Sequence, residues 1–257
     1  MQNTELKIIY EDADFLVIDK PAGIVVFPET NISEKTLIDL LLEKYPDFKN
    51  TGSPPRYGIV HRLDKDTSGI LLAAKNNQAL FFLQKQFSSF AKSYGGSAEA
   101  FGEGGKKRHL EKILEKRYIA LVIGNLKNDQ GTIETLIGRA PKNRKKQKVY
   151  LTGEPGSERK RKAITGYKVI EKFPNYTLIE ASPKTGRKHQ IRCHFAYINH
   201  PIAGDKVYGF KNQPCPKGLS RHFLHARYLK IKLPDKKTKE FFSPLPDELK
   251  IILEKLK

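Results

Sequence analysis

The chain has 257 residues, 39% of them hydrophobic and 10% aromatic, which is enough to bury a core as one large domain or two small ones. Its 47 basic and 28 acidic side chains give a formal net charge of +19. An excess of this size favours a polyanionic partner, because lysine and arginine gain affinity by displacing counterions from phosphates. The alternative is a soluble protein that is merely basic.

Several other classes of protein fit the sequence poorly. No run reaches the roughly 20 apolar residues of a membrane span, and residues 1–7 lack the basic and apolar regions of a signal peptide. The two cysteines, Cys193 and Cys215, are far apart and have no paired-ligand spacing, which argues against a disulfide framework or a zinc site. We therefore expect a cytoplasmic protein that does not enter a membrane.

The first part of the chain predicts three strands and two helices. The strands are expected at residues 6–10, 15–19 and 69–74. A helix is expected at 36–45, and a second one follows Asn76 or Asn77, either of which can cap it. Between them, a loop at 51–55 leads into the apolar run 57–63, which we interpret as a strand that ends at Asp64.

The second part begins with a glycine-rich stretch at 92–110, which we interpret as a flexible excursion. Strands are expected at residues 117–124, 132–138, 163–171, 176–181 and 221–233. One helix is expected at 189–198, and an amphipathic helix that buries Leu249, Ile252, Leu253 and Leu256 ends the chain. Strands and helices mix without regular βαβ alternation, so the predicted class is α+β in one domain, residues 1–257.

The densest positive charge lies at residues 139–162, where ten lysines and arginines accompany only Glu154 and Glu158. The stretch 153–157 inside this segment is a turn signal. The functional interpretation is a basic hairpin that contacts RNA phosphates. The alternative is a solvated surface loop.

Asp64 follows an apolar run and precedes the polar turn 65–69. A carboxylate between a strand and a loop is suited to catalysis, because the strand fixes it and the loop exposes it. The alternative is that Asp64 or Asp66 caps the turn. The residues alone favour the cap, since polar turns are common and catalytic ones are rare.

A second group of polar residues lies at 185–194, where Arg187, His189, Gln190 and Arg192 crowd the expected start of a helix. Such a position is suited to binding phosphate or to keeping a carboxylate ionised. A metal site built from His189, His194 and the later histidines lacks a carboxylate or cysteine at ligand spacing, so we expect no metal.

The nine residues His61-Arg62-Leu63-Asp64-Lys65-Asp66-Thr67-Ser68-Gly69 resemble the characteristic motif of the RluA-type RNA pseudouridine synthases. Further segments resemble that family in the same order along the chain, at residues 19–23, 116–122, 185–194 and 222–226. The basic segment 139–162 resembles the hairpin with which the family embraces RNA. The resemblance covers nearly the whole chain.

The resemblance implies a pseudouridine synthase fold, with a mixed and mostly antiparallel sheet, a central cleft and peripheral helices. It also implies isomerisation of uridine in ribosomal or transfer RNA without a cofactor. The uridine is flipped out of the RNA, its glycosidic bond breaks, and C5 of the rotated base bonds to the ribose. Flipping is required physically, because stacking hides the bond. The small RNA-binding module that precedes the catalytic domain in many members is expected to be absent, and we expect a monomer.

The resemblance also implies roles for single residues. Asp64 is the catalytic aspartate, which either attacks the sugar or stabilises charge. Arg192 is the preferred ion-pair partner that keeps it ionised, and Arg187 is the alternative. Tyr118 would stack on the flipped uracil and assist proton removal; otherwise it is a core tyrosine. Arg62 would replace the flipped base or hold the RNA backbone; otherwise it is a surface arginine.

Other residues are expected to contact RNA. They are His61, Thr67, Arg144, Lys145, Lys146, Arg187, His189 and Gln190. The competing functions are a non-catalytic RNA-binding protein and a metal-dependent nuclease. The joint presence of Asp64, Tyr118 and Arg192 argues against the first, and the lack of a carboxylate cluster argues against the second.

Overall fold

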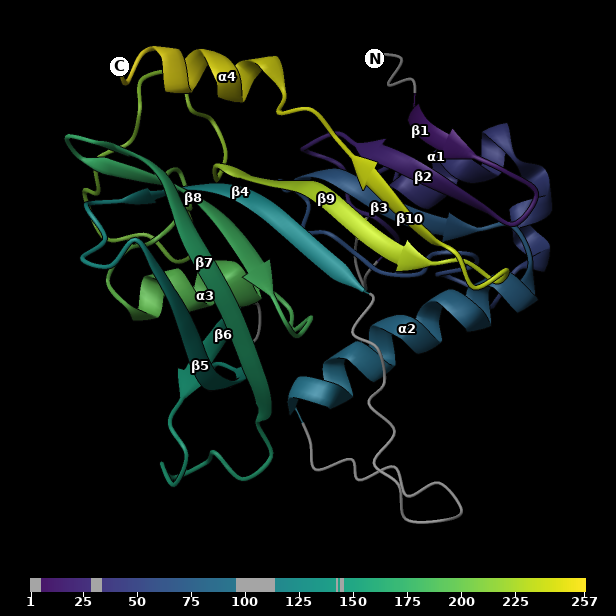
Figure 1. Ribbon diagram of the computed structural model, residues 1–257, viewed down its shortest axis with the longest axis horizontal. Coiled ribbons are helices and arrows are strands. Elements are labelled where there is room, and N and C mark those ends of the chain that lie inside the picture. The colour runs from purple at the N-terminus through teal and green to yellow at the C-terminus, as the bar shows by residue number, and fades with distance from the viewer. Residues whose placement is uncertain (1–5, 29–33, 96–113, 142, 144–145) are drawn as a thin grey trace.

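The computed structural model describes residues 6–28, 34–95, 114–141, 143 and 146–257 (Figure 1). Ten strands form one mixed sheet in the order β1-β2-β3-β9-β4-β8-β7-β5-β6, with β10 paired to β9. The strands are β1 Lys7–Glu11, β2 Phe15–Lys20, β3 Ser68–Ala74, β4 Glu115–Ile123, β5 Gln130–Arg139, β6 Gln147–Tyr150, β7 Arg161–Phe173, β8 Tyr176–Pro183, β9 Leu224–Lys232 and β10 Thr238–Phe242. The helices are α1 Leu37–Lys44, the 3-10 helix η1 Pro46–Asn50, α2 Asn77–Gly95, α3 Gln190–Tyr197 and α4 Asp247–Glu254. The fold is α+β, as predicted.

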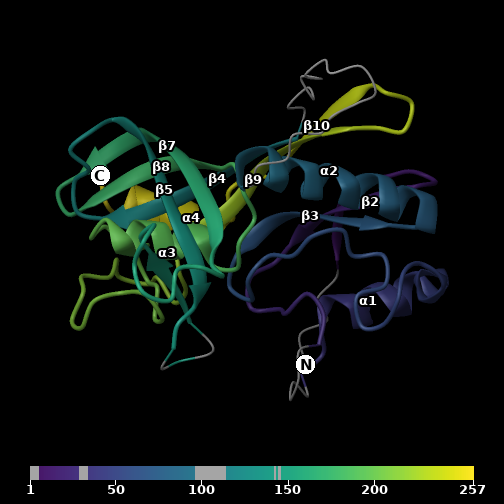
Figure 2. The ribbon, with the colours of Figure 1, turned by 90° about the horizontal axis from the view of Figure 1, so that it is seen from below.

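The N-terminal half is a three-layer arrangement, in which α1 and α2 lie on opposite sides of β2 and β3 (Figure 2). Because successive side chains of a strand point to opposite faces, Leu16 and Ile18 pack with the residues of α1, whereas Phe15 and Val17 pack with those of α2. Both faces of β2 are therefore buried, which explains its nearly continuous apolar sequence.

The predicted start of α1 is confirmed, because the Thr36 backbone N–H and hydroxyl both donate to the Asp39 carboxylate, at 2.8 and 2.7 Å. The Asp39 carboxylate thereby satisfies the backbone N–H of Thr36, the residue that precedes the helix.

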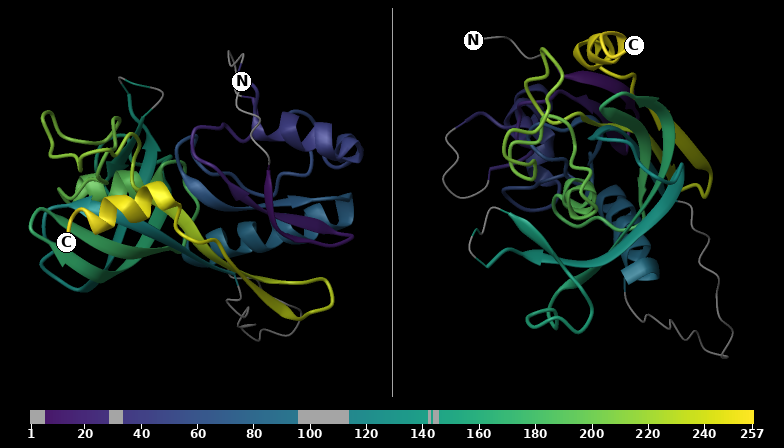
Figure 3. Two further views of the ribbon diagram at one scale, coloured as in Figure 1. Left: turned by 90° about the horizontal axis from the view of Figure 1, so that it is seen from above. Right: turned by 90° about the vertical axis from the view of Figure 1, so that its left-hand side faces the viewer.

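The C-terminal half curls its strands around α3 (Figure 3). Ile191 and Phe195 of α3 share one core cluster with Leu249 and Ile252 of α4. The inward face expected for the C-terminal helix is therefore confirmed at these two positions. The two halves meet where β3 and β9 pair in parallel, through Ser68 with His225 and Gly69 with Ala226. The other strand pairs of the described residues are antiparallel.

Four expectations need correction. Residues 57–63 are not a strand, since this run makes a single bridge, Ile59 with Ala73, and Asp64 therefore lies in a loop that enters β3. The strand β10 was not predicted. Residues 92–95 of the expected excursion continue α2, and most of the remaining stretch lies outside the described residues. The segment 139–162 is not one hairpin throughout, since its first part pairs β5 with β6 as a hairpin and residues 151–160 then lead to β7.

No helix in the described part of the chain is both long and apolar enough to cross a membrane.

Candidate active site

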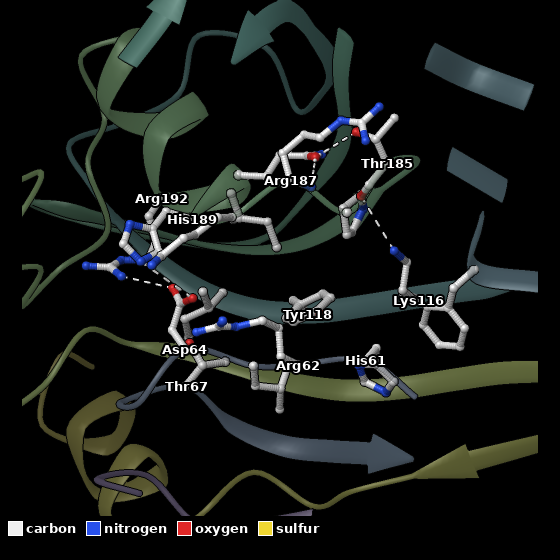
Figure 4. Close-up of a pocket in the computed structure, with 18 of the residues that line it drawn as sticks. His61, Arg62, Asp64, Thr67, Lys116, Tyr118, Thr185, Arg187, His189 and Arg192 are labelled. Carbon is white, nitrogen blue, oxygen red and sulfur yellow. Dashed lines mark hydrogen bonds and ion pairs between the residues drawn. The ribbon is translucent and has the colours of Figure 1, made fainter. Parts of the chain in front are cut away.

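A cavity of about 670 Å³ opens at the junction of the two halves, a size typical of ligand sites. The loop before β3, strand β4 and the start of α3 contribute its walls (Figure 4). Among the described residues that line it, Asp64 is the sole carboxylate. The lining also holds many lysines and arginines, namely Arg56, Arg62, Lys116, Arg139, Arg161, Arg187, Lys188 and Arg192. The cavity is therefore suited to a polyanion.

The loop that carries Asp64 is fixed from several sides. The Thr67 N–H donates to the Asp64 carbonyl at 3.1 Å, which closes a turn. The Thr67 hydroxyl bonds to Nε2 of His222 at 2.8 Å, and Ser68 bonds to Nδ1 of His225 at 2.9 Å. These contacts bury the turn and leave the Asp64 carboxylate to face the cavity.

The buried side chain of Lys20 also supports the loop that carries Asp64. Its ammonium donates to the carbonyls of Pro21, Ile24 and Lys65, at 2.7, 2.9 and 3.0 Å. Burial and the charge of Arg221 lower the pKa of Lys20 to about 7. Lys20, in the segment 19–23, thus holds the loop by a hydrogen bond to the backbone of Lys65, the residue after Asp64.

Gly69 allows the two halves to join. Its φ is +111°, and a Cβ at this position would collide with the backbone of Ala226 on β9. Glycine lacks this atom and adopts positive φ without strain. The last residue of the Asp64 motif is therefore required by the β3–β9 contact.

The Asp64 carboxylate pairs with Arg192, whose Nη1 lies 2.9 Å from Oδ2. The same guanidinium donates from Nε and Nη2 to Asp205, at 2.7 and 2.9 Å. Arg192 is thus held between two carboxylates. Of the two partners considered for Asp64, the structure places Arg192 there, whereas Arg187 donates its Nε to the Lys162 carbonyl at 2.9 Å.

The electrostatics keep Asp64 ionised. Burial opposes the charge, but His189, Arg192 and the hydrogen bond from Arg192 outweigh it and hold the pKa of Asp64 below its ordinary value. Burial in turn lowers the pKa of His189, so this imidazole is neutral near pH 7 and Arg192 is the permanent cation. The side chain of Asp64 serves as an ion-pair partner and not as the cap of its own turn.

His189 lies beside the catalytic candidate, with Nε2 3.7 Å from Asp64 Oδ1. It precedes α3 in a left-handed conformation, with φ of 55°. Figure 4 shows His189 and Arg192 both pointing toward Asp64. The helix start thus places both groups on one carboxylate.

Tyr118 lines the cavity from β4. The pairing of β4 with β9 shifts register between Arg117 and Tyr118, and such a bulge re-aims the side chain that follows it. Burial and the charge of Asp64 raise the pKa of Tyr118. Its hydroxyl is therefore protonated near neutral pH.

Two residues of the Asp64 motif contact aromatic rings. The guanidinium of Arg62 lies 5.0 Å from the centre of the Phe27 ring, a cation–π contact at the cavity wall. The His61 ring stacks on Phe87 at 4.7 Å, and its Nε2 accepts the Leu72 N–H at 3.2 Å. Burial and the charge of Lys116 lower the pKa of His61 to about 3, so His61 supports the wall as a neutral group.

Gln190 and Thr67 line the cavity but are held by hydrogen bonds within the fold. Gln190 is buried, and its amide bonds to Thr185, the Arg187 N–H, the Ile164 carbonyl and Thr165. The structure thus gives Gln190 a supporting role in the cavity wall, and its contact with RNA stays a prediction. Thr67 is likewise buried against His222.

The remaining expected RNA contacts lie in the loop between β5 and β6. Lys146 closes this loop by donating its N–H to the Asn143 carbonyl at 2.9 Å, whereas Arg144 and Lys145 lie outside the described residues. Sequence reasoning missed Asp205 and Tyr208, which hold Arg192 and His189, because neither stands near the motifs. Among the described residues, no group of three or more His, Cys, Asp or Glu is placed to hold a metal ion.

Comparison with known proteins identifies relatives across the chain. A family model described as RNA pseudouridylate synthase matches residues 14–197. The ribosomal large subunit pseudouridine synthase D of Nitrosomonas europaea is 38% identical over 259 aligned residues, which cover 98% of this chain and 65% of the relative. An RNA pseudouridine synthase of Aquifex aeolicus is 40% identical over 220 residues, covering 85% of this chain and 60% of the relative. The chain thus spans less than two thirds of the length of both.

A solved structure has the same architecture. The human RNA pseudouridylate synthase domain containing 1 matches with a TM-score of 0.70 and 26% identity, over 93% of this chain and 83% of that one. The family model covers more than half of the chain and includes Asp64, Tyr118 and Arg192. The chain therefore belongs to the RNA pseudouridylate synthase family.

Proposed function

We propose that this protein isomerises uridine to pseudouridine in structured RNA, with Asp64 as the catalytic residue. The observation that carries the proposal is an ionised carboxylate, paired with Arg192 at 2.9 Å, inside a cavity whose lining is rich in lysine and arginine. The cations attract the RNA, and the carboxylate meets the one sugar that enters the cavity. A uridine reaches this depth only when it is flipped out of the stack.

The reaction breaks the N1–C1′ bond of the uridine and forms a C5–C1′ bond. The proton on C5 is lost to a base or to solvent, and N1 gains a proton, so the atoms balance. Asp64 either bonds to the sugar or stabilises its positive charge while the base rotates. Both roles require the carboxylate form, which Arg192 maintains.

Tyr118 would hold the rotating base by stacking, from β4 across the cavity from the Asp64 loop. Its raised pKa favours a neutral hydroxyl, which supports stacking and hydrogen bonding more than proton abstraction. Arg62 and Arg187, both on the cavity wall, would contact the RNA backbone.

The relative from Nitrosomonas europaea is named for the large ribosomal subunit. We propose ribosomal RNA as the first substrate to test, with transfer RNA as the alternative. We also propose that the protein acts as a monomer in the cytoplasm.

The test uses purified protein with ribosomal and transfer RNA, and maps pseudouridine with and without the enzyme. Asp64→Ala is expected to abolish conversion and to leave RNA affinity within a few-fold of wild type. Conversion by Asp64→Ala contradicts the role of Asp64. If the wild type binds RNA but converts none, the second candidate holds, a non-catalytic RNA-binding protein; the +19 charge favours binding in either case.

A further inference from the structure

One short segment, residues 205–208, contacts both neighbours of Asp64. Asp205 accepts two hydrogen bonds from Arg192. The Tyr208 hydroxyl lies 2.9 Å from Nδ1 of His189. Asp205 also accepts the backbone N–H of Tyr208 at 3.0 Å. The contact of Asp205 with Arg192 and that of Tyr208 with His189 therefore come from one turn, whose hydrogen bond fixes them relative to each other.

The hydrogen-bond partners assign the protonation of His189. The Tyr208 oxygen accepts the backbone N–H of Gln147 at 2.8 Å, and a backbone N–H only donates. Among the described hydrogen-bond partners of Tyr208, Nδ1 of His189 is the one atom that can accept the hydroxyl hydrogen, so we assign Nδ1 as the acceptor. A neutral His189 therefore carries its proton on Nε2, the atom 3.7 Å from Asp64 Oδ1.

Tyr208 also connects this site to the segment that we propose to bind RNA. Gln147 is the first residue of β6, which lies within the basic segment 139–162. The Tyr208 ring packs against the cluster that includes Val149 of β6 and Cys193 of α3, and the Arg192 guanidinium lies 5.2 Å from the ring centre. One hydroxyl group thus contacts both the first residue of β6 and His189.

We propose that Tyr208 is a positioning residue, whose hydroxyl fixes His189 with Nε2–H toward Asp64 and ties that arrangement to β6. RNA that contacts β6 then acts on the orientation of His189 and, through it, on the carboxylate of Asp64. The consequence for turnover rests on the proposed function, whereas the tautomer and orientation of His189 belong to the free protein.

The first measurement needs no RNA. Nitrogen NMR of imidazole-labelled wild type is expected to show His189 as the Nε2-protonated tautomer, and Tyr208→Phe is expected to shift it toward a mixture. Tyr10→Phe is the matched control, since it also removes one tyrosine hydroxyl bond, to Asp12 at 2.9 Å, in β1. An Nδ1-protonated His189 in wild type, or an unchanged tautomer in Tyr208→Phe, overturns the proposal.

The second measurement is the single-turnover rate at saturating enzyme. Tyr208→Phe is expected to lower it about tenfold, the effect of removing one positioning hydrogen bond, while Tyr10→Phe leaves it unchanged. In a His189→Asn background, which suits the left-handed position, Tyr208→Phe should cost nothing more. Additive losses contradict action through His189. If wild type converts no RNA, the proposed function fails, and the NMR result still decides the role of Tyr208.

Discussion

Asp205 lies behind Arg192 and accepts two hydrogen bonds from its guanidinium, at 2.7 and 2.9 Å, with no exposed side-chain surface of its own. The ion pair at Asp64 is thus one end of a chain of charges that runs into the core. A carboxylate buried in this way is stable only while the arginine remains, and the arginine depends equally on the carboxylate.

Asp205→Asn is therefore expected to reduce the free energy of unfolding by ~3–5 kcal/mol. The substitution keeps an oxygen for the N–H groups of Val207 and Tyr208, but it removes the charge that Arg192 contacts. Urea unfolding measures the loss. The control is Asp129→Asn, because Asp129 pairs with Lys172 at an exposed site, and its loss should stay below ~1 kcal/mol. Equal losses in the two variants would contradict a buried, paired Asp205.

The same pair predicts a pH dependence of stability. Burial opposes the charge of Asp205, but the hydrogen bonds and charge of Arg192 hold its pKa below the ordinary value of 3.8. A carboxyl whose folded pKa is lowered stabilises the protein above its unfolded pKa, and this contribution disappears as the pH falls through the folded pKa. The stability difference between wild type and Asp205→Asn should be constant above pH ~5 and shrink below pH ~4. A difference that grows on acidification would reverse the sign of the effect.

Gly69→Ala is expected to destabilise the protein by more than ~2 kcal/mol, because the new Cβ meets the Ala226 backbone at a positive φ. Gly153→Ala separates the two causes, since Gly153 also has a positive φ, +85°, but nothing lies within 4 Å of its Cβ position. This control should cost about 1 kcal/mol, the conformational part alone. Thermal unfolding of both variants provides the comparison. Equal losses of stability would show that the contact of Gly69 with the Ala226 backbone does not require glycine.

Replacement of Lys146 and Lys148 by alanine is expected to weaken RNA affinity and to flatten its salt dependence, by about one unit of slope for each phosphate that is no longer neutralised. Lys127 and Lys172 are the control pair, because they lie near the end of β5 and β7 that is remote from the loop 140–146. Binding is measured over a series of salt concentrations. An unchanged slope in the first double variant would remove this loop from the RNA interface.

Local patterns predicted most of the fold. The apolar run of β2 and the helical spacing of apolar residues in α1 and α4 predicted these elements, because short-range patterns specify them. The strand predicted at 57–63 was wrong, because strand formation also needs a pairing partner. The run is apolar enough for a strand, but it makes only a single bridge. The strand β10 was missed because its charged residues are typical of a loop. Its strand conformation depends on pairing with β9, which the local sequence does not indicate.

The site was predictable only in part. Asp64, Tyr118 and Arg192 were found through motifs, and the structure places them around one cavity. Asp205 and Tyr208 were missed, because an isolated aspartate and tyrosine in a loop acquire their roles through α3, which precedes them in the chain. The support that Gln190 provides was not predicted: two of its hydrogen bonds reach β7, at Ile164 and Thr165, and the other two reach Thr185 and Arg187 before α3.

The parallel contact of β3 with β9 has a consequence for synthesis of the protein. Ser68 bonds to a histidine 157 residues later, and Arg192 and Asp205 likewise follow Asp64 at long distance. A nascent chain that has produced the aspartate loop lacks both its electrostatic partner and the strand that supports it. Since chains emerge N-terminus first, an incompletely synthesised copy can carry the motif without the ion pair at Asp64. The proposed site is complete only after β9 has been inserted between β3 and β4.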